Sequence, residues 1–470
     1  MIRNIILLFL ISIYIQLSAA AHIDVVYPKT NDLTVNSASI FFLGNTTQGA
    51  NFTINSQKVK LWDNNFFVHV IPLKYGKNYI KMTSVKNGIK EQKIYTVTRS
   101  KPAINNSTDK LPFEPKKADY TVYTKTINEN ATIRENPSSS AQRVIDIPQN
   151  VVLYIEGRKG EYYKLEEKGE SEYWIHKSNV QNPVNVSKRI PAVLKKIKTS
   201  SDKHYDYIKF ALNYPVLYNL KQNGNNIELT IFGIENTDIN GNKQPNFTYK
   251  YESEKQLIGY DAYYEDNRLI LRIAKAPEIK DKEHPLKDIT IFVDPGHGGS
   301  ENGAIGPTRT AEKDINLAIG RYLKKALEDE GANVIISRMD DHKIGLYERV
   351  QMAKDNNALI SLSIHNNALP NGKNPYFQHG TEVHYYNENA KLLAEIIQND
   401  MSQILNFKDN GIHKSSFALN RSTNPVSVLV ECAYMIHPEE YMRLRNPALQ
   451  RQIAQVIKNS LKKYIITIQE

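Results

Sequence analysis

The stretch Ile289-Thr290-Ile291-Phe292-Val293-Asp294-Pro295-Gly296-His297-Gly298-Gly299 decides the fold of the C-terminal third of this 470-residue chain. Its first five residues are largely apolar and predict a buried strand, which a glycine-rich turn follows directly. From this strand onward, apolar strands alternate with segments of helical period. Such alternation predicts an α/β domain with a mostly parallel sheet covered by helices on both faces.

The segments after the turn keep this alternation. The expected strands are 332–337, 358–364, 381–386 and 426–430, and the expected helices are 314–330, 345–356, 389–405 and 447–464. Ligands of such folds bind beyond the carboxyl ends of strands. Because His297, His365 and Glu431 each come at the end of an expected strand, we expect them to lie at one edge of the sheet.

Four short strings in this domain carry candidate metal chemistry: Asp294 to Gly299, Glu312, Ser363 to Asn367, and Val428 to Glu431. The imidazoles of His297 and His365 and the carboxylate of Glu312 match the three protein ligands of a catalytic zinc site with an open position for water. The net charge of +1 keeps zinc a strong Lewis acid, which lowers the pKa of bound water from about 9 toward ~7. Glu431 is a spare carboxylate and a candidate general base.

Each string also has a plainer interpretation. The glycine-rich turn could hold a phosphate, but it lacks the Lys-Ser/Thr ending of such loops. Glu312 alone would more often cap a helix or complement its dipole, and His365 alone would more often be a satisfied core residue. The combination favours the metal site. Cys432, the one cysteine, is expected to be a small buried strand residue rather than a nucleophile.

These four strings, in this order, resemble the zinc-dependent N-acetylmuramoyl-L-alanine amidases from about Lys287 to Tyr464, within an expected domain of 287–466. The resemblance implies that His297, Glu312 and His365 hold zinc and that Glu431 is catalytic. The implied reaction is hydrolysis of the amide that joins the lactyl group of N-acetylmuramic acid to L-alanine of the peptidoglycan stem peptide.

Further polar residues of this domain are candidate substrate contacts. Asn366 and Asn367 could orient a metal ligand or bind substrate, and His413 and Arg421 fall in the family's substrate-facing region. The remaining histidines of this part of the domain are expected on the surface or behind the ligands: His379, His384 and His437.

Two departures from the family pattern are visible. The string from Cys432 to Pro438 is a variant that could change substrate fit. The segment between His365 and Thr381 is too short for the long inhibitory helix of activator-dependent relatives. The resulting hypothesis is an open site that needs no activator.

Three small all-β domains are expected before the catalytic domain, which makes the chain multidomain. Residues 22–99 alternate as in a β-sandwich and resemble bacterial immunoglobulin-like modules, and 100–117 is an expected linker. Residues 118–185 resemble a bacterial SH3-like barrel, and 187–282 resemble the AMIN-like localisation modules that precede many bacterial amidases. In the barrel Tyr162, Tyr173 and Trp174 could contact wall peptides or form the core, and the pattern leaves both open.

Residues 1–21 are expected to be a signal peptide cut after Ala20 or Ala21, with a retained anchor as the alternative. The mature protein is then exported to the periplasm or the cell wall, without stable membrane insertion. The net charge of +10 favours anionic envelope polymers as partners besides peptidoglycan. Scattered lysines argue against nucleic acid. Rival functions are another zinc peptidase acting on wall peptides and a catalytically inactive wall-binding protein.

Overall fold

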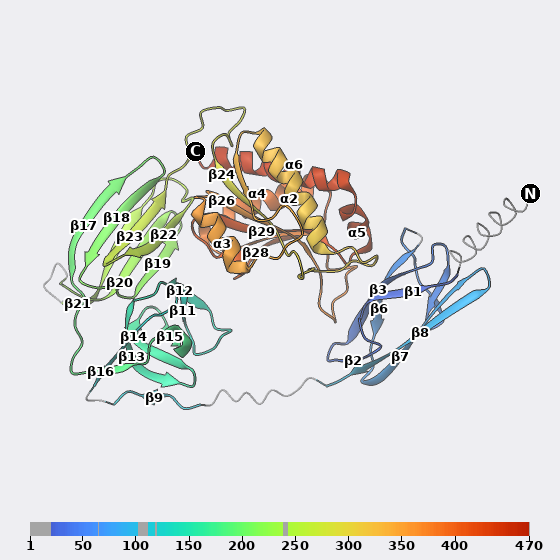
Figure 1. The fold of residues 1–470 in the computed structure, drawn as a ribbon, viewed down its shortest axis with the longest axis horizontal. Helices are drawn as coiled ribbons and strands as arrows, with labels where there is room; N and C mark the ends of the chain where they lie inside the picture. Colours follow the sequence, from blue (N-terminus) through green and yellow to red (C-terminus); the bar gives the residue numbers. More distant parts are fainter. Residues whose placement is uncertain (1–19, 64, 102–110, 118–119, 238–242, 470) are drawn as a thin grey trace, which may run out of the picture. The chain divides into compact units, whose positions relative to one another are not determined.

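The computed structural model describes residues 20–63, 65–101, 111–117, 120–237 and 243–469, which Figure 1 draws as a ribbon. The chain divides into two compact units, 1–104 with 279–467 and 105–278 with 468–470. The expected signal peptide, apart from Ala20 and Ala21, and residues 102–110 of the expected linker lie outside the described residues. Within the described residues, no helix is both long and apolar enough to cross a bilayer.

A six-stranded sheet forms the centre of the C-terminal domain, in the order β25-β24-β26-β29-β27-β28. The strands are β24 (Thr290–Pro295), β25 (Asn333–Ile336), β26 (Ile360–Asn367), β27 (Thr381–Tyr385), β28 (Asp409–Lys414) and β29 (Val426–Tyr434). The first four in this order run parallel, whereas β27 pairs antiparallel with β29 and parallel with β28. The mostly parallel sheet is confirmed. The edge strand β28 was not expected, because it carries few apolar residues.

Helices cover both faces of this sheet, as the sequence predicted. They are α2 (Glu312–Asp329), α3 (Leu346–Asp355), α4 (Lys391–Leu405), α5 (Pro438–Leu444) and α6 (Pro447–Thr467). Ala353 of α3 packs against Phe292 of β24. Gly320 of α2 lies against the ring of Pro295, which faces the opposite side because strand residues alternate. Helices α2 and α4 both contact α6, so these three form the layer on that side.

The register of β26 and β29 places two candidate site residues side by side. His365 pairs with Glu431, and the pairing continues through an irregularity to Asn367 and Tyr434. The sequence-based strand ends at Ile364 and Val430 were therefore wrong, because polar side chains near a site interrupt the apolar pattern without interrupting the backbone ladder. Neighbouring strands lie about 4.8 Å apart, so the two side chains start from adjacent positions.

The N-terminal part of the first unit is a two-sheet sandwich, called here the N-terminal sandwich (residues 20–101). One sheet contains β1 (Ile23–Tyr27), β3 (Ser39–Thr46) and β6 (Phe66–Pro72). The other contains β2 (Asp32–Val35), β4 (Asn51–Ile54), β5 (Gln57–Lys58), β7 (Gly76–Lys86) and β8 (Ile89–Arg99). Phe42, Phe52 and Phe67 are among the buried residues that fill the space between the sheets.

The second unit is entirely β apart from one 3₁₀ turn, among its described residues. Its first sheet contains β9 (Glu114–Pro115), β10 (Thr121–Lys125), β11 (Ala131–Arg134), β12 (Arg143–Ile147), β13 (Val152–Lys159), β14 (Tyr162–Lys168), β15 (Glu172–His176) and β16 (Val184–Val186). A second contains β17 (Leu194–Ser201), β18 (Tyr205–Leu212), β22 (Tyr260–Glu265) and β23 (Arg268–Ala274), and a third β19 (Tyr218–Asn223), β20 (Asn226–Thr237) and β21 (Lys243–Glu252).

One apolar core runs through this second unit, from Ala131 in the first sheet to Ile273 in the second. Tyr173 and Trp174 are 2% and 4% exposed, which fits the core alternative for these two aromatics. Tyr162 is partly exposed and packs edge-on against His176. Of the three aromatics, Tyr162 alone keeps accessible surface for a ligand.

Candidate metal centre

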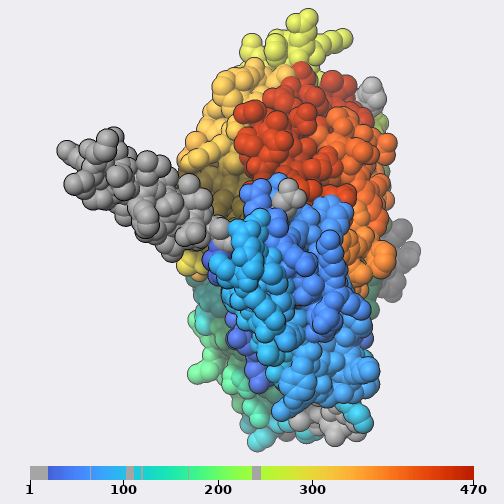
Figure 2. Space-filling model, turned by 90° about the vertical axis from the view of Figure 1, so that its right-hand side faces the viewer, coloured from blue at the N-terminus to red at the C-terminus, as the bar shows by residue number. Residues whose placement is uncertain are grey.

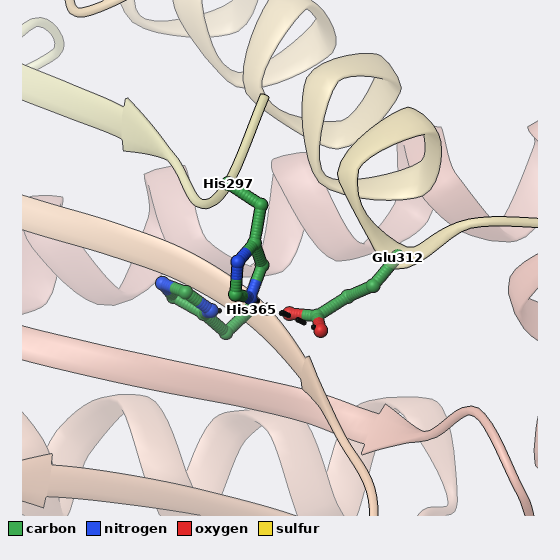
Figure 3. Close-up of side chains that lie close together, drawn as sticks. All are labelled: His297, Glu312 and His365. Carbon is green, nitrogen blue, oxygen red and sulfur yellow. Dashed lines mark hydrogen bonds and ion pairs between the residues drawn. The ribbon is translucent and has the colours of Figure 1, made fainter. Parts of the chain in front are cut away.

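Three side chains from three elements converge at one edge of the C-terminal sheet (Figure 3). His297 follows β24, Glu312 is the first residue of α2, and His365 lies in β26. His297 Nε2 is 3.2 Å from Glu312 Oε2, and His365 Nδ1 is 3.0 Å from Glu312 Oε1. The two imidazole rings stand 4.9 Å apart at 79°. The structure thus brings together the three ligands that the sequence suggested.

The spacing of these atoms fits a single metal ion. In a tetrahedral zinc site with bonds of about 2.0–2.1 Å, ligand atoms lie roughly 3.3 Å from one another. The two nitrogen–oxygen distances at Glu312 are close to this value. Two imidazoles and one carboxylate form a donor set suited to such an ion, so these residues are a candidate metal site.

Two glycines leave the space that the cluster needs. A Cβ on Gly296 would lie 2.2 Å from His365 Cε1. A Cβ on Gly303 would lie 2.3 Å from Glu312 Oε2, and Gly303 has a φ of +66°. Any side chain at either position would displace a candidate ligand. Gly296 belongs to the turn that decided the fold, whereas the sequence did not single out Gly303.

Glu312 is oriented by several donors. The backbone N–H groups of Ala304 and Asn366 donate to its two oxygens at 2.8 and 3.1 Å, and Asn316 Nδ2 donates at 3.1 Å. Burial opposes ionisation of this carboxyl, but hydrogen bonds and charge from His297 and His365 outweigh it and hold the pKa well below its usual range. Glu312 is therefore an anion that points at both rings.

A buried ion pair supports the loop that carries His297. Arg349 pairs with Asp294, and its Nη2 donates to His297 O at 2.7 Å. Arg338 Nη2 donates to Gly296 O at 2.9 Å. His297 itself has a φ of +61°, a conformation that few side chains adopt. The sequence did not identify either arginine, although a charged Asp294 at the end of a buried strand was a signal that a partner had to exist.

Glu431 lies opposite His365 on one side and opposite Glu382 of β27 on the other. Its Oε2 atom is buried without a hydrogen-bond partner among the described residues. Burial raises the pKa of Glu431 well above its usual value, and the negative charges of Glu312 and Glu382 add to the effect. This carboxyl is suited to holding a proton.

Glu382 is a buried residue that sequence reasoning missed. Burial opposes its ionisation, but the hydrogen bond and charge of His384, with Asn410 and His413, lower its pKa overall. Asn367 Nδ2 also donates to it. A glutamate in the expected strand 381–386 was the available signal. Glu382 and Glu431 are thus two neighbouring carboxyls whose pKa values are moved in opposite directions.

The candidate substrate contacts occupy different places. Asn366 is 1% exposed and donates through Nδ2 to Asn316 Oδ1 at 2.7 Å, behind Glu312. Asn367 and His413 gather around Glu382, with His413 Nε2 at 3.6 Å from its Oε2. Arg421 is partly exposed and donates to Ser416 O at 3.3 Å.

Cys432 is fully buried in β29, as expected, and burial raises the pKa of its thiol. Residues 368–380, all of them described, contain turns and no helix. The segment that would hold an inhibitory helix therefore has none.

A second group, His379, His437 and Glu440, has a similar composition. His379 Nδ1 lies 2.7 Å from Glu440 Oε1, but the two rings stack in parallel at 3.9 Å and 7°. Lone pairs lie in the ring planes, so stacked rings do not direct them at one ion. His437 Nδ1 also accepts the N–H of Glu440 at 3.3 Å. This group is a hydrogen-bonded cluster, and His384 likewise contacts Ser415 Oγ at 2.9 Å.

Residues 291–463 match the family described as N-acetylmuramoyl-L-alanine amidase. The uncharacterized protein YqiI of Bacillus subtilis is 36% identical over 183 residues, which are 38% of this chain and 86% of YqiI. The amidase LytC of the same organism is 34% identical over 39% of this chain but only 36% of LytC. An amidase structure from Clostridium difficile is 32% identical, with a TM-score of 0.37, over 38% of this chain and 98% of that one.

Proposed function

The chain belongs to the N-acetylmuramoyl-L-alanine amidase family, and from this premise we propose that His297, Glu312 and His365 hold a zinc ion while Glu431 moves the proton. The bond cleaved is the amide between N-acetylmuramic acid and L-alanine of peptidoglycan. The observation that carries the proposal is the convergence of two imidazole nitrogens on one buried carboxylate, at 3.2 and 3.0 Å.

Zinc bound there would supply a Lewis acid for the scissile carbonyl and for a water molecule. The chain's own residues supply the rest. Glu312 stays ionised through its hydrogen bonds, and Asn366 with Asn316 keeps it oriented toward the rings. Such outer-shell hydrogen bonds typically change metal affinity by about 10–100-fold.

Glu431 acts as general base and then as general acid. It takes a proton from the attacking water and gives it to the amine of L-alanine as the amide bond breaks. Burial and the negative charges of Glu312 and Glu382 raise the pKa of Glu431 and so favour its proton-carrying form, whereas the pKa of Glu382 is lowered. Asn367, His413 and Arg421 are assigned to substrate contact, and Asn366 to orientation of Glu312.

The β domains position the enzyme on the wall. We assign 22–99 to an immunoglobulin-like module, 118–185 to an SH3-like module and 187–282 to an AMIN-like module, with the catalytic domain at 287–466. The basic charge of +10 supports contact with anionic envelope polymers as well as peptidoglycan. The protein works outside the cytoplasm, and its site is open without an activator.

Digestion of purified peptidoglycan, with and without a chelator, tests this function. Mass analysis of the products should show intact stem peptides with a free L-alanine amine. Cleavage between stem residues would instead identify a peptidase. An isolated catalytic domain that is inert until a partner is added would refute activator independence.

Glu431→Gln separates the proton-moving role from metal binding. The variant should keep its zinc, measured by elemental analysis, and lose lysis by a factor of about 100–10,000, the usual contribution of general acid–base catalysis. Lysis at the wild-type rate would contradict the assignment of Glu431.

A further inference from the structure

The N-terminal sandwich contacts the C-terminal domain within the first unit. Arg309 donates to both carboxylate oxygens of Asp24, at 2.7 and 2.6 Å. Tyr376 OH donates to Val68 O at 2.7 Å. Figure 2 shows the sandwich, in blue, against the orange and red parts of the chain. We call this contact the seam.

An apolar cluster closes the seam. Val26, Phe41, Leu43 and Val68 of the sandwich share it with Leu369, Tyr434 and Ile436 of the C-terminal domain, each 9% exposed or less. The rings of Phe66 and Tyr441 also pack edge to face, with an interplanar angle of 87° and 5.6 Å between their centroids. Buried apolar surface of this kind stabilises a fixed arrangement of the two parts.

A cavity of about 430 Å³ lies at the seam. The residues that line it come from both sides: Val25, Val26 and Lys29 from the sandwich, and Asn302, Ile305 and Arg309 from the C-terminal domain. We call it the seam groove. Neither part of the chain forms it alone.

The seam groove borders the candidate metal centre through one short loop. Its residues Asn302 and Ile305 flank Gly303 and Ala304. Gly303 lies directly against Glu312 and His297, and the N–H of Ala304 donates to Glu312 at 2.8 Å. A chain bound in the groove would therefore lie next to the residues that position the metal.

The charge and lining of the groove select a ligand class. Lys29 is exposed and makes no ion pair among the described residues, whereas Arg309 is engaged by Asp24. One ammonium group is thus left for an anion. The partly exposed Val25 and Ile305 offer apolar contact, and Asn302 offers an amide. A phosphate-rich polymer would require several cations, so this lining suits a short peptide with small side chains and a free carboxylate.

We propose that the seam groove binds the stem peptide of peptidoglycan, with a stem carboxylate on Lys29 Nζ. The proposal rests on the proposed function, because the stem peptide is then the leaving side of the substrate. The stem peptide begins at the scissile amide, so it leaves the metal centre along a neighbouring surface, and the loop from Asn302 to Ile305 connects that centre to the groove. The N-terminal sandwich thereby supplies part of the substrate site.

Binding to the full chain tests this, in a Glu431→Gln background so that turnover does not consume the probe. The probes are a soluble muramyl tetrapeptide and the same compound with its peptide carboxyls amidated, titrated by calorimetry. Lys29→Ala should weaken binding of the acid form about fivefold, as for a partly exposed ion pair, and leave the amidated form unchanged. Lys29→Arg should restore it. Lys77→Ala, at an exposed lysine of β7, is the matched control and should change nothing.

Equal binding of the acid form by Lys29→Ala and its parent would overturn the proposal. So would a Lys29-dependent affinity for polyglycerol phosphate without affinity for the muramyl peptide, which would make the groove a polymer site. Because these titrations need no turnover, they remain informative if the wild-type chain fails to cleave peptidoglycan. That failure would refute the proposed function separately.

Discussion

Two groups in the same domain contain two histidines and one glutamate, and they differ in orientation. In the first, His297 and His365 are nearly perpendicular at 79° and both face Glu312. In the second, His379 and His437 are stacked at 7° beside Glu440. Residue types are the same, so composition alone does not distinguish a metal site from a hydrogen-bonded cluster.

The difference originates in the backbone. His297 takes a φ of +61° in a loop held by buried arginines, and His365 lies inside a strand. His437 instead precedes the short helix α5 and accepts a hydrogen bond from its first turn. A helix cap needs one ring nitrogen, which removes that atom from metal binding. The comparison teaches that the local role of each histidine decides what the cluster can do.

Loss of a ligand should give the largest difference between the two groups. His365→Ala should abolish zinc retention and lower activity by more than the roughly 10–100-fold typical of outer-shell changes. His437→Ala should keep the zinc content of the wild type. Elemental analysis of the purified variants measures both. An equal loss of zinc in His437→Ala would mean that the second group also binds metal.

Loss of the buried ion pair that supports the His297 loop should have the next largest effect. Arg349→Met leaves Asp294 buried and unpaired, and breaking a buried ion pair in this way costs about 3–5 kcal/mol. Denaturant unfolding of the C-terminal domain measures the change. Lys325→Met, which removes an exposed ion pair with Asp329 on α2 of the same domain, is the control and should leave the unfolding midpoint in place. Unchanged stability in Arg349→Met would show that Asp294 finds another partner.

The sequence was sufficient for the α/β alternation and for selecting the three side chains that converge at the candidate metal centre, because both depend on local signals. Strand and helix periods are visible within a few residues, and the glycine-rich turn fixes where His297 emerges. The strand ends near His365 and Glu431 were misplaced, since polar residues inside β26 and β29 mimic the end of an apolar strand.

Contacts between distant segments could not be predicted in this way. The position of Glu382 beside Glu431 depends on the antiparallel register of β27 and β29, and a shift of one residue would turn its side chain to the other face. Gly303 matters because of what a Cβ would meet in space. The ion pair of Asp24 with Arg309 joins residues 285 positions apart, and no local pattern encodes it.

Gly303→Ala should weaken metal binding at the first group and leave the second group unchanged. The new Cβ would fall 2.3 Å from Glu312 Oε2 in a backbone conformation that alanine disfavours. Zinc affinity, measured by competition with a chromophoric chelator, should fall about tenfold, the lower end for outer-shell changes. Gly345→Ala is the matched control, since its nearest atom would be 3.8 Å away. Equal zinc affinities in the two variants would show that the loop around Gly303 moves to accommodate the new Cβ.

A pH dependence of stability is expected at the second group. Burial lowers the pKa of His437 from 6.5 to about 4, with the charge of Glu440 opposing and those of His379 and Lys408 adding. As pH falls through 6.5, His437 of the unfolded chain binds a proton that the folded chain still excludes. The free energy of unfolding therefore decreases until about pH 4. Above pH 6.5, His437 is neutral in both states and the free energy of unfolding is not reduced. Between pH 6.5 and 4 the free energy of unfolding falls by at most about 3 kcal/mol.

His437→Asn keeps a side chain that can cap α5 but removes the titrating ring. Its free energy of unfolding should therefore decline less than that of the wild type between pH 6.5 and 4, whatever its value at pH 7.5. Denaturant titrations at several pH values measure the slope. Because the first group is unaltered, zinc content at pH 7.5 should match the wild type. Parallel stability curves for the two proteins would mean that the ring of His437 takes up its proton as readily in the folded chain as in the unfolded one, and that the two clusters differ less than their geometry indicates.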